Sequence, residues 1–214
     1  MIKREDGRDT RRRLLRAACE VFAEKGYQKA KVADICRRAG ANVASVNYYF
    51  GNKRSLYKEA WHHALNAFEE PVLPEPAPGS SRERLRAFIH SLIRNFTADS
   101  DAGRFSRLYL MEMVTPTGLI QEAWHELIEP RRRILQALIR DVMGAGGDDL
   151  DVLFSELSII NQCRTLVTVK SSDLEYMLGR PLSPRLIEQL ADHIADFSLA
   201  GIQATGARQA APDA

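Results

Sequence analysis

Apolar residues recur at helical spacing along most of this chain of 214 residues. The strict alternation of apolar and polar residues that is typical of strands is nearly absent. A first helix is predicted over residues 9–26, capped by Asp9 or Thr10 and closed at Gly26. Shorter apolar faces predict two further helices over residues 32–39 and 43–50. With 45% hydrophobic residues available for a core, the sequence predicts an all-α protein.

The chain is expected to divide into a small N-terminal domain and a larger helical domain. The first would cover residues 1–53, the second residues 54–206, and the last residues, 207–214, would fray. Pro71, Pro74, Pro76 and Pro78 predict an extended connector at 71–81, because proline-rich segments do not continue a helix. Long amphipathic stretches follow, including residues 150–169 and 183–201, and about nine helices are expected in total.

Charge is distributed unevenly along the chain. Residues 1–60 hold 15 Lys and Arg against 7 Asp and Glu, whereas the remaining residues hold 15 against 21. A basic N-terminal domain followed by an acidic domain suggests a polyanionic partner for the first.

The sequence does not have the features of a membrane protein, a secreted protein or a metalloprotein. The longest uncharged stretch, Ala39 to Asn52, has 14 residues, which is shorter than the roughly 18 apolar residues of a spanning helix. The N-terminus lacks the apolar core of a secretory signal, so we expect a cytoplasmic protein. Cys19, Cys36 and Cys163 lack the C-x-x-C spacing of a zinc site, and no metal or cofactor is expected.

The first three predicted helices, with Gly40 in the turn between the second and third, match a helix-turn-helix. With Val46 facing inward, the helical wheel places Val43 and Phe50 on the same buried face. The opposite face then carries Ala44 and Tyr48, flanked by Ser45 and Asn47, while Asn42 precedes the helix and is expected to cap it.

The outward face suits the edges of DNA bases. Asn47 has an amide of the kind that pairs with adenine, and the small Ala44 can meet a thymine methyl group. Lys53 and Tyr49 are expected to hold the sugar-phosphate backbone, and Lys29 and Lys31 a phosphate at the second helix. Nonspecific charge would come from Arg4, Arg8, Arg11, Arg12 and Arg13. The alternative is that these cations form only a solvated surface.

The segment FAEKGYQKAKVADICRRAGANVASVNYYFGNKRSLY resembles the N-terminal domain of the tetracycline-repressor (TetR) family over about residues 10–58. This resemblance implies an all-helical homodimer whose first domain binds a palindromic operator and whose larger, variable domain binds a small-molecule inducer. Ala30 and Lys31 stand where the family often has Thr or Ser, Asn42 where Ser is common, and Asn47 where Tyr is common. The run Asn47-Tyr48-Tyr49-Phe50-Gly51 resembles the CecR-like branch of the family.

On the family pattern, the last two long helices would pair with those of a second copy. Their apolar residues would divide between the core and a two-fold interface: Leu153, Phe154, Leu157, Ile160, Leu186, Leu190 and Ile194. Packing within one chain is the alternative reading of these wide faces.

An effector pocket is expected to take aromatic and sulfur-containing side chains from residues 105–125, with polar contacts from Gln162 and Arg164. The candidates in that segment are Phe105, Tyr109, Met111, Met113, Trp124 and His125. Such side chains also fill ordinary helical cores, which is the alternative for each of them.

A di-iron carboxylate enzyme is the alternative from another class. Two Glu-x-x-His motifs, Glu59 with His62 and Glu122 with His125, have the spacing used by such enzymes. The first motif follows the predicted DNA-reading helix closely, and nothing requires the two motifs to meet, so we expect no enzyme. A DNA-binding dimer without an inducer also remains open, as does the choice between repressor and activator.

Overall fold

The computed structural model describes residues 2–66, 73, 80–98, 101–121, 125 and 128–210. Within these residues the chain forms ten α-helices, one short 3-10 helix and no strand, which confirms the all-α prediction. The helices belong to two compact units, Met1–Phe68 with Ala98–His125 and Glu69–Thr97 with Glu126–Ala214. In the described part of the chain, no helix is both long enough and apolar enough to cross a membrane.

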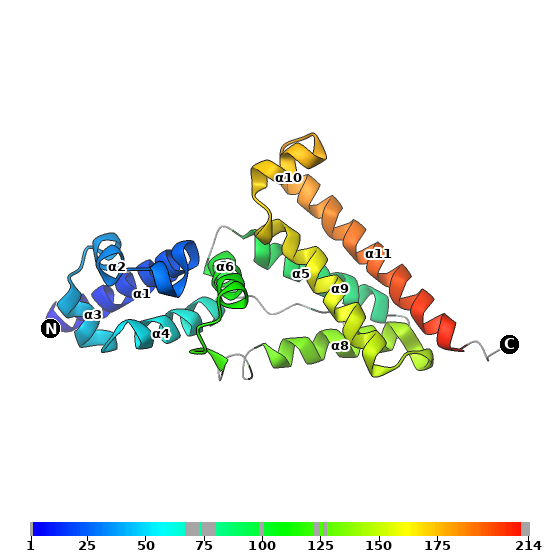
Figure 1. Cartoon of the computed structure of the whole chain (residues 1–214), viewed down its shortest axis with the longest axis horizontal. Helices are drawn as coiled ribbons and strands as arrows, with labels where there is room; N and C mark the ends of the chain where they lie inside the picture. The colour runs from blue at the N-terminus through cyan, green and yellow to red at the C-terminus, as the bar shows by residue number, and fades with distance from the viewer. Residues whose placement is uncertain are drawn as a thin grey trace. The chain divides into compact units, whose positions relative to one another are not determined.

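The first unit contains five helices (Figure 1): α1 (Ile2–Lys29), α2 (Val32–Ala39), α3 (Val43–Phe50), α4 (Lys53–Asn66) and α6 (Asp101–Val114). Helix α1 is the centre of this unit, because α2, α3, α4 and α6 all pack against it. Phe22, Tyr57 and Trp61 are fully buried between these helices. The unit therefore extends beyond the helix-turn-helix segment, since α4 and α6 share its core.

Helix α1 bends at Gly26, where the sequence predicted its end. The backbone of Gly26 has φ 68° and ψ 169°, a conformation almost restricted to glycine. At its other end the predicted cap is wrong, because α1 already begins at Ile2. Asp9 lies within the helix and forms ion pairs with Arg12 (2.8 Å) and Arg13 (3.1 Å) instead of capping the N-terminus.

The second unit is built from four long helices, α5 (Ser81–Thr97), α8 (Glu129–Met143), α9 (Asp149–Thr168) and α11 (Pro184–Ala210), with the 3-10 turn η1 (Gly144–Gly146) and the short helix α10 (Ser171–Leu178). Figure 1 shows α10 between the end of α9 and the start of α11. Apolar faces of the four long helices meet in a core that includes Leu85, Ile89, Leu135, Ile139, Ile159, Ala195 and Leu199. Pro130 lies in the first turn of α8, a position where proline is tolerated.

Helix α11 continues to Ala210, so the predicted fraying from residue 207 is wrong over residues 207–210. The physical reason is a close approach at Gly206, which is buried. A side chain there would collide with the backbone of Met143 at the end of α8. The glycine therefore lets the last turns of α11 pack on α8 and η1. Residues 211–214, and most of the predicted proline-rich connector, lie outside the described residues.

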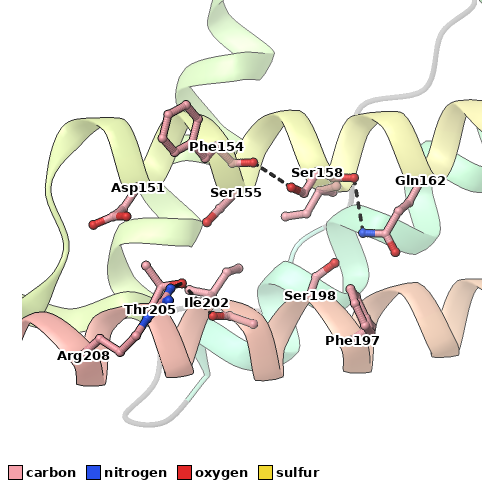
Figure 2. Close-up of a pocket in the computed structure, with 12 residues that line it drawn as sticks. Asp151, Phe154, Ser155, Ser158, Gln162, Phe197, Ser198, Ile202, Thr205 and Arg208 are labelled. Carbon is pink, nitrogen blue, oxygen red and sulfur yellow. Dashed lines mark hydrogen bonds between the residues drawn. The ribbon is translucent and has the colours of Figure 1, made fainter.

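A shallow groove runs between α9 and α11 (Figure 2). Its lining includes Ser155, Ser158, Gln162 and Ser198, and the Gln162 side-chain amide donates to the backbone oxygen of Ser158 (3.2 Å). Two large aromatic side chains also line it while remaining largely exposed, Phe154 (60%) and Phe197 (63%). The groove volume of about 250 Å³ is below the roughly 300–1,000 Å³ of typical small-molecule pockets. An exposed apolar surface of this shape is more typical of a protein interface.

We expect Gly26→Ala to destabilise the protein by about 1–3 kcal/mol, because an alanine must adopt a backbone conformation that only glycine reaches without strain. Urea-induced unfolding measures this free energy. Gln28→Ala, an exposed substitution in the last turn of the same helix, is the control and should change stability by less than about 0.5 kcal/mol. Equal unfolding midpoints for the two variants would contradict the assignment of the bend to Gly26.

Candidate nucleic-acid interface

Helices α2 and α3 form a helix-turn-helix on the surface of α1. Ile35 and Ala39 of α2 are buried on one side of the turn, and Val46 and Phe50 of α3 on the other. Between them Gly40 adopts the left-handed conformation (φ 60°, ψ 42°), and the next N–H, from Ala41, donates to the carbonyl oxygen of Cys36 (2.9 Å). This left-handed glycine ends α2, and only residues 40–42 connect it to α3.

Asn42 caps α3 as the sequence predicted. Its Oδ1 accepts hydrogen bonds from the backbone N–H of Ser45 (2.9 Å) and from the Ser45 hydroxyl (3.0 Å). The cap satisfies one of the N–H groups that a helix start leaves without a partner. It also fixes the rotation of the first turn, and with it the direction of the outward side chains.

The outward face of α3 carries the residues predicted for base contact. Ala44, Asn47 and Tyr48 are exposed, Tyr48 to 82%, and Ser45 is half-buried. Val43 was predicted to face inward, and this is wrong, since 48% of it is exposed. Val43 is the first residue of a two-turn helix and follows the exposed Asn42, so no preceding turn of its own helix covers it.

Tyr49 is held beside this face. Its ring meets that of Tyr48 edge to face, with 4.9 Å between the centroids. A methyl group at Gly7 would lie 3.2 Å from the Tyr49 hydroxyl oxygen, so the phenol approaches the backbone of α1 closely. The glycine leaves room for this approach, and the contact limits the directions in which the Tyr49 hydroxyl can point.

Two predicted phosphate ligands have different surroundings. Lys31 is exposed, and it occupies the N-cap position of α2 without a side-chain cap bond. Lys53 instead lies over the ring of Tyr27 (4.5 Å to the centroid) and donates to the backbone oxygen of Gln28 (3.5 Å). Partial burial lowers the pKa of Lys53. Lys31 is thus free to reach outward, whereas Lys53 is fixed at the start of α4.

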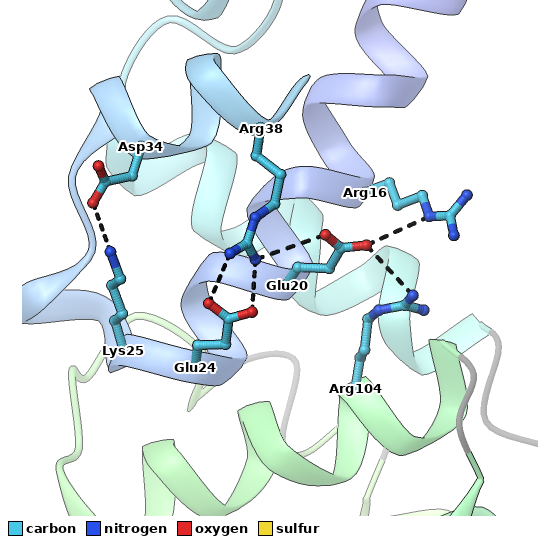
Figure 3. Close-up of polar contacts among 7 residues, drawn as sticks. All are labelled: Arg16, Glu20, Glu24, Lys25, Asp34, Arg38 and Arg104. Carbon is cyan, nitrogen blue, oxygen red and sulfur yellow. Dashed lines mark hydrogen bonds and ion pairs between the residues drawn. The ribbon is translucent and has the colours of Figure 1, made fainter. Parts of the chain in front are cut away.

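Ion pairs attach α2 to α1 (Figure 3). Arg38 donates to both carboxylate oxygens of Glu24, at 2.7 and 3.0 Å, and this hydrogen bonding holds the pKa of Glu24 below its ordinary value. Lys25 donates to Asp34 (2.7 Å) and lowers the pKa of that carboxyl group. Glu20 forms ion pairs with Arg38 of α2 (3.7 Å) and with Arg104 of α6 (3.4 Å). Sequence reasoning missed these pairs, because their partners lie up to 84 positions apart.

One ligand proposed for the alternative di-iron site, Glu59, has another partner in the structure. Glu59 forms an ion pair with Arg11, whose guanidinium also lies over the ring of Phe50 (5.1 Å). His62 and His125 are exposed, and Glu122 lies outside the described residues. Where the structure describes the chain, no three His, Cys, Asp or Glu side chains gather as a metal site would require.

The predicted effector residues that the structure describes lie in different surroundings. Phe105 is 3% exposed and packs edge to face on Trp61 (5.1 Å), with Tyr109 next to it (6.3 Å). Met113 is 46% exposed, and Trp124 lies outside the described residues. Gln162 belongs to the other unit, in the groove of α9 and α11. Phe105 and Tyr109 thus contribute to the core of the first unit.

Comparison with known proteins agrees with this site. Residues 14–60 match the family described as "Bacterial regulatory proteins, tetR family". Residues 81–202, more than half of the chain, match the family described as "HTH-type transcriptional dual regulator CecR, C-terminal domain". Together with the helix-turn-helix and its exposed reading face, these matches define a DNA-binding transcriptional regulator and not an enzyme. The chain belongs to the TetR family, in its CecR-like branch.

Two curated relatives agree with this assignment, and a solved structure shares the fold. The transcriptional dual regulator CecR of Shigella flexneri is 26% identical over 168 residues, covering 73% of this chain and 74% of that protein. The negative transcriptional regulator of the biofilm operon icaADBC, IcaR, of Staphylococcus epidermidis is 27% identical, covering 60% of this chain and 66% of that protein. A crystal structure of FadR from Bacillus subtilis in complex with stearoyl-CoA has a TM-score of 0.60 and 21% identity, covering 88% of this chain and 97% of that chain.

Proposed function

We propose that this protein is a ligand-responsive repressor that binds a palindromic operator as a homodimer in the cytoplasm. The observation that carries the proposal is the outward face of α3, where Ala44, Asn47 and Tyr48 project into solvent from a capped helix whose opposite face is buried. A helix presented in this way fits the major groove, and two copies related by a two-fold axis read two half-sites. The relative described as a negative transcriptional regulator favours repression over activation.

In this proposal one group of residues contacts the bases and another group contacts the sugar-phosphate backbone. Asn47, Ala44, Ser45 and Tyr48 face the base edges, whereas Tyr49 contacts the sugar-phosphate backbone at the edge of the groove. Phosphates bind at the starts of α2, α3 and α4, where Lys31, Asn42 and Lys53 stand.

The proposed dimer forms through α9 and α11. Five large apolar side chains on these helices are exposed in the single chain: Leu150, Leu153, Phe154, Leu157 and Phe197. The two aromatic ones line the groove between α9 and α11, so exposed apolar surface is available there for a second copy. Of the seven residues predicted for the core and interface, Leu153, Phe154 and Leu157 are exposed and Ile194 is buried, while Ile160, Leu186 and Leu190 are intermediate.

We expect preferential binding to the DNA upstream of the protein's own gene, measured by fluorescence anisotropy at moderate salt. Asn47→Ala should weaken binding to that duplex by about 1–3 kcal/mol, with little effect on a scrambled duplex, because a base contact is lost. Lys31→Ala is the matched comparison. It should weaken binding to both duplexes alike and reduce the slope of log Kd against log salt concentration by about the amount expected for one phosphate contact. Equal affinity of the unaltered protein for both duplexes would refute the operator proposal.

Leu157→Glu should convert the dimer into a monomer, because the charged side chain would be buried in the interface without a partner. Sedimentation velocity measures the mass directly. Tyr176→Glu is the control, since Tyr176 is also a large exposed side chain (89%) but lies on α10, away from the groove. The proposed interface through α9 and α11 would be contradicted if the Leu157→Glu variant is still a dimer, or if the unaltered protein is a monomer.

The effector is proposed to bind in the helical C-terminal domain and to release operator DNA. Stearoyl-CoA is the first compound to test, because the structure of FadR contains it. An effector should raise the unfolding temperature and weaken operator binding in the same concentration range. If a broad set of acyl-CoA thioesters and other small molecules produces neither change, the alternative of a DNA-binding dimer without an inducer is favoured.

A further inference from the structure

Glu112 is a buried carboxylate that the DNA-reading residues do not explain. It lies near the end of α6 and is only 7% exposed. Its Oε2 accepts the hydroxyl of Tyr57 on α4 (2.8 Å), and its Oε1 accepts the backbone N–H of Thr117 (2.7 Å). The Thr117 hydroxyl donates to the same Oε1 (2.9 Å). A buried carboxylate is costly unless hydrogen bonds compensate it, and an apolar residue would fill the same space at lower cost.

The segment after α6 is organised around this carboxylate. Thr117 uses both its N–H and its hydroxyl on Glu112, and the Thr117 hydroxyl oxygen in turn accepts the N–H of Leu119 (3.1 Å). The segment therefore cannot move away from α6 without breaking hydrogen bonds to a charged group, which are stronger than those between neutral groups.

On its other side the carboxylate reaches the DNA-binding helices through aromatic rings. The Tyr57 ring packs on Phe22 and on Tyr27, with 4.9 Å between the centroids in each case. Tyr27 supports Lys53, whose ammonium lies 4.5 Å above the ring. Lys53 and Tyr57 are four positions apart on α4, so they share one face of that helix. Helix α3 also packs on α4.

We propose that Glu112 is a positioning residue for DNA binding. With Tyr57 it forms a hydrogen-bonded latch that ties the segment after α6 to α4, one turn after Lys53, the residue proposed to meet the DNA backbone. The latch orders Lys53 and the end of α3 before DNA arrives, which reduces the entropy cost of binding. A change in the segment around Thr117 then alters DNA affinity, although Thr117 itself touches no DNA. This inference rests on the proposed phosphate contact of Lys53.

The test is a double-mutant cycle on DNA affinity in the full-length protein. Tyr57→Phe and Thr117→Val each remove one hydroxyl donor to Glu112 and nearly preserve side-chain shape. Tyr57→Phe should raise the Kd about tenfold, because Lys53 is no longer held in place. It should also lower the slope of log Kd against log salt concentration by about the amount expected for one phosphate contact. Thr117→Val should raise the Kd about threefold alone and have almost no effect in the Tyr57→Phe background.

Thr97→Val on α5 is the control, because the Thr97 hydroxyl donates to the backbone of its own helix (2.8 Å) and has no place in the latch. Thermal unfolding of every variant separates lost stability from lost binding. If Tyr57→Phe lowers the unfolding temperature but leaves both the Kd and the salt dependence unchanged, or if the two Kd effects are additive, the latch is refuted.

Failure of the latch is distinguishable from failure of the operator proposal. Should the unaltered protein show no preference for the upstream duplex, the operator proposal fails, and the cycle is then measured on an unrelated duplex at low salt. Lys53 contacts phosphates on any sequence, so the same non-additive pattern is expected there, and additive or absent effects refute the latch in that case as well.

Discussion

The burial of Val46 and Phe50 against α1 fixes the orientation of α3. These two side chains lie one helical turn apart, and burying them leaves a single possible outward face. Everything proposed for DNA reading depends on this packing, because rotation of α3 by half a turn would place Tyr48 in the core. The N-cap bond from Asn42 and the left-handed turn at Gly40 support the same orientation from the start of the helix.

Each unit also contains a buried carboxylate whose hydrogen bonds connect separate helices. In the first unit Glu112 joins α6 to α4 through Tyr57, and burial together with this bond raises the pKa of the tyrosine. In the second unit Glu156 of α9 accepts Arg132 (2.6 and 3.0 Å) and Gln136 (2.7 Å) from α8. Breaking such a pair leaves a buried group without a partner, so both sites restrict how the helices can slide. Positional precision of this kind is what a DNA-reading surface requires.

The sequence was informative wherever a short local pattern determines the structure. The bounds of α2 and α3, the cap by Asn42 and the exposure of Tyr48 all follow from residues within about ten positions of one another. Prediction was wrong at helix ends: Val43, the first residue of α3, is exposed because no preceding turn covers it, and α11 continues past residue 207, with Gly206 packed on Met143. The short helix α10 was missed, since it buries Leu174 alone and so has no continuous apolar face in its sequence. The ion pair of Glu20 with Arg104 and the hydrogen bond of Tyr57 to Glu112 join residues remote in sequence, and only the fold brings them together.

A hydroxyl-radical footprint of the protein on the DNA upstream of its gene tests the central claim most directly. Two α3 helices in a two-fold dimer should protect two patches on one face of the duplex, with centres about 34–36 Å apart. Tyr48→Ala should weaken protection of both patches together. A single protected patch, or a footprint that the Tyr48→Ala variant leaves unchanged, would contradict the account of α3 as the element that enters the groove.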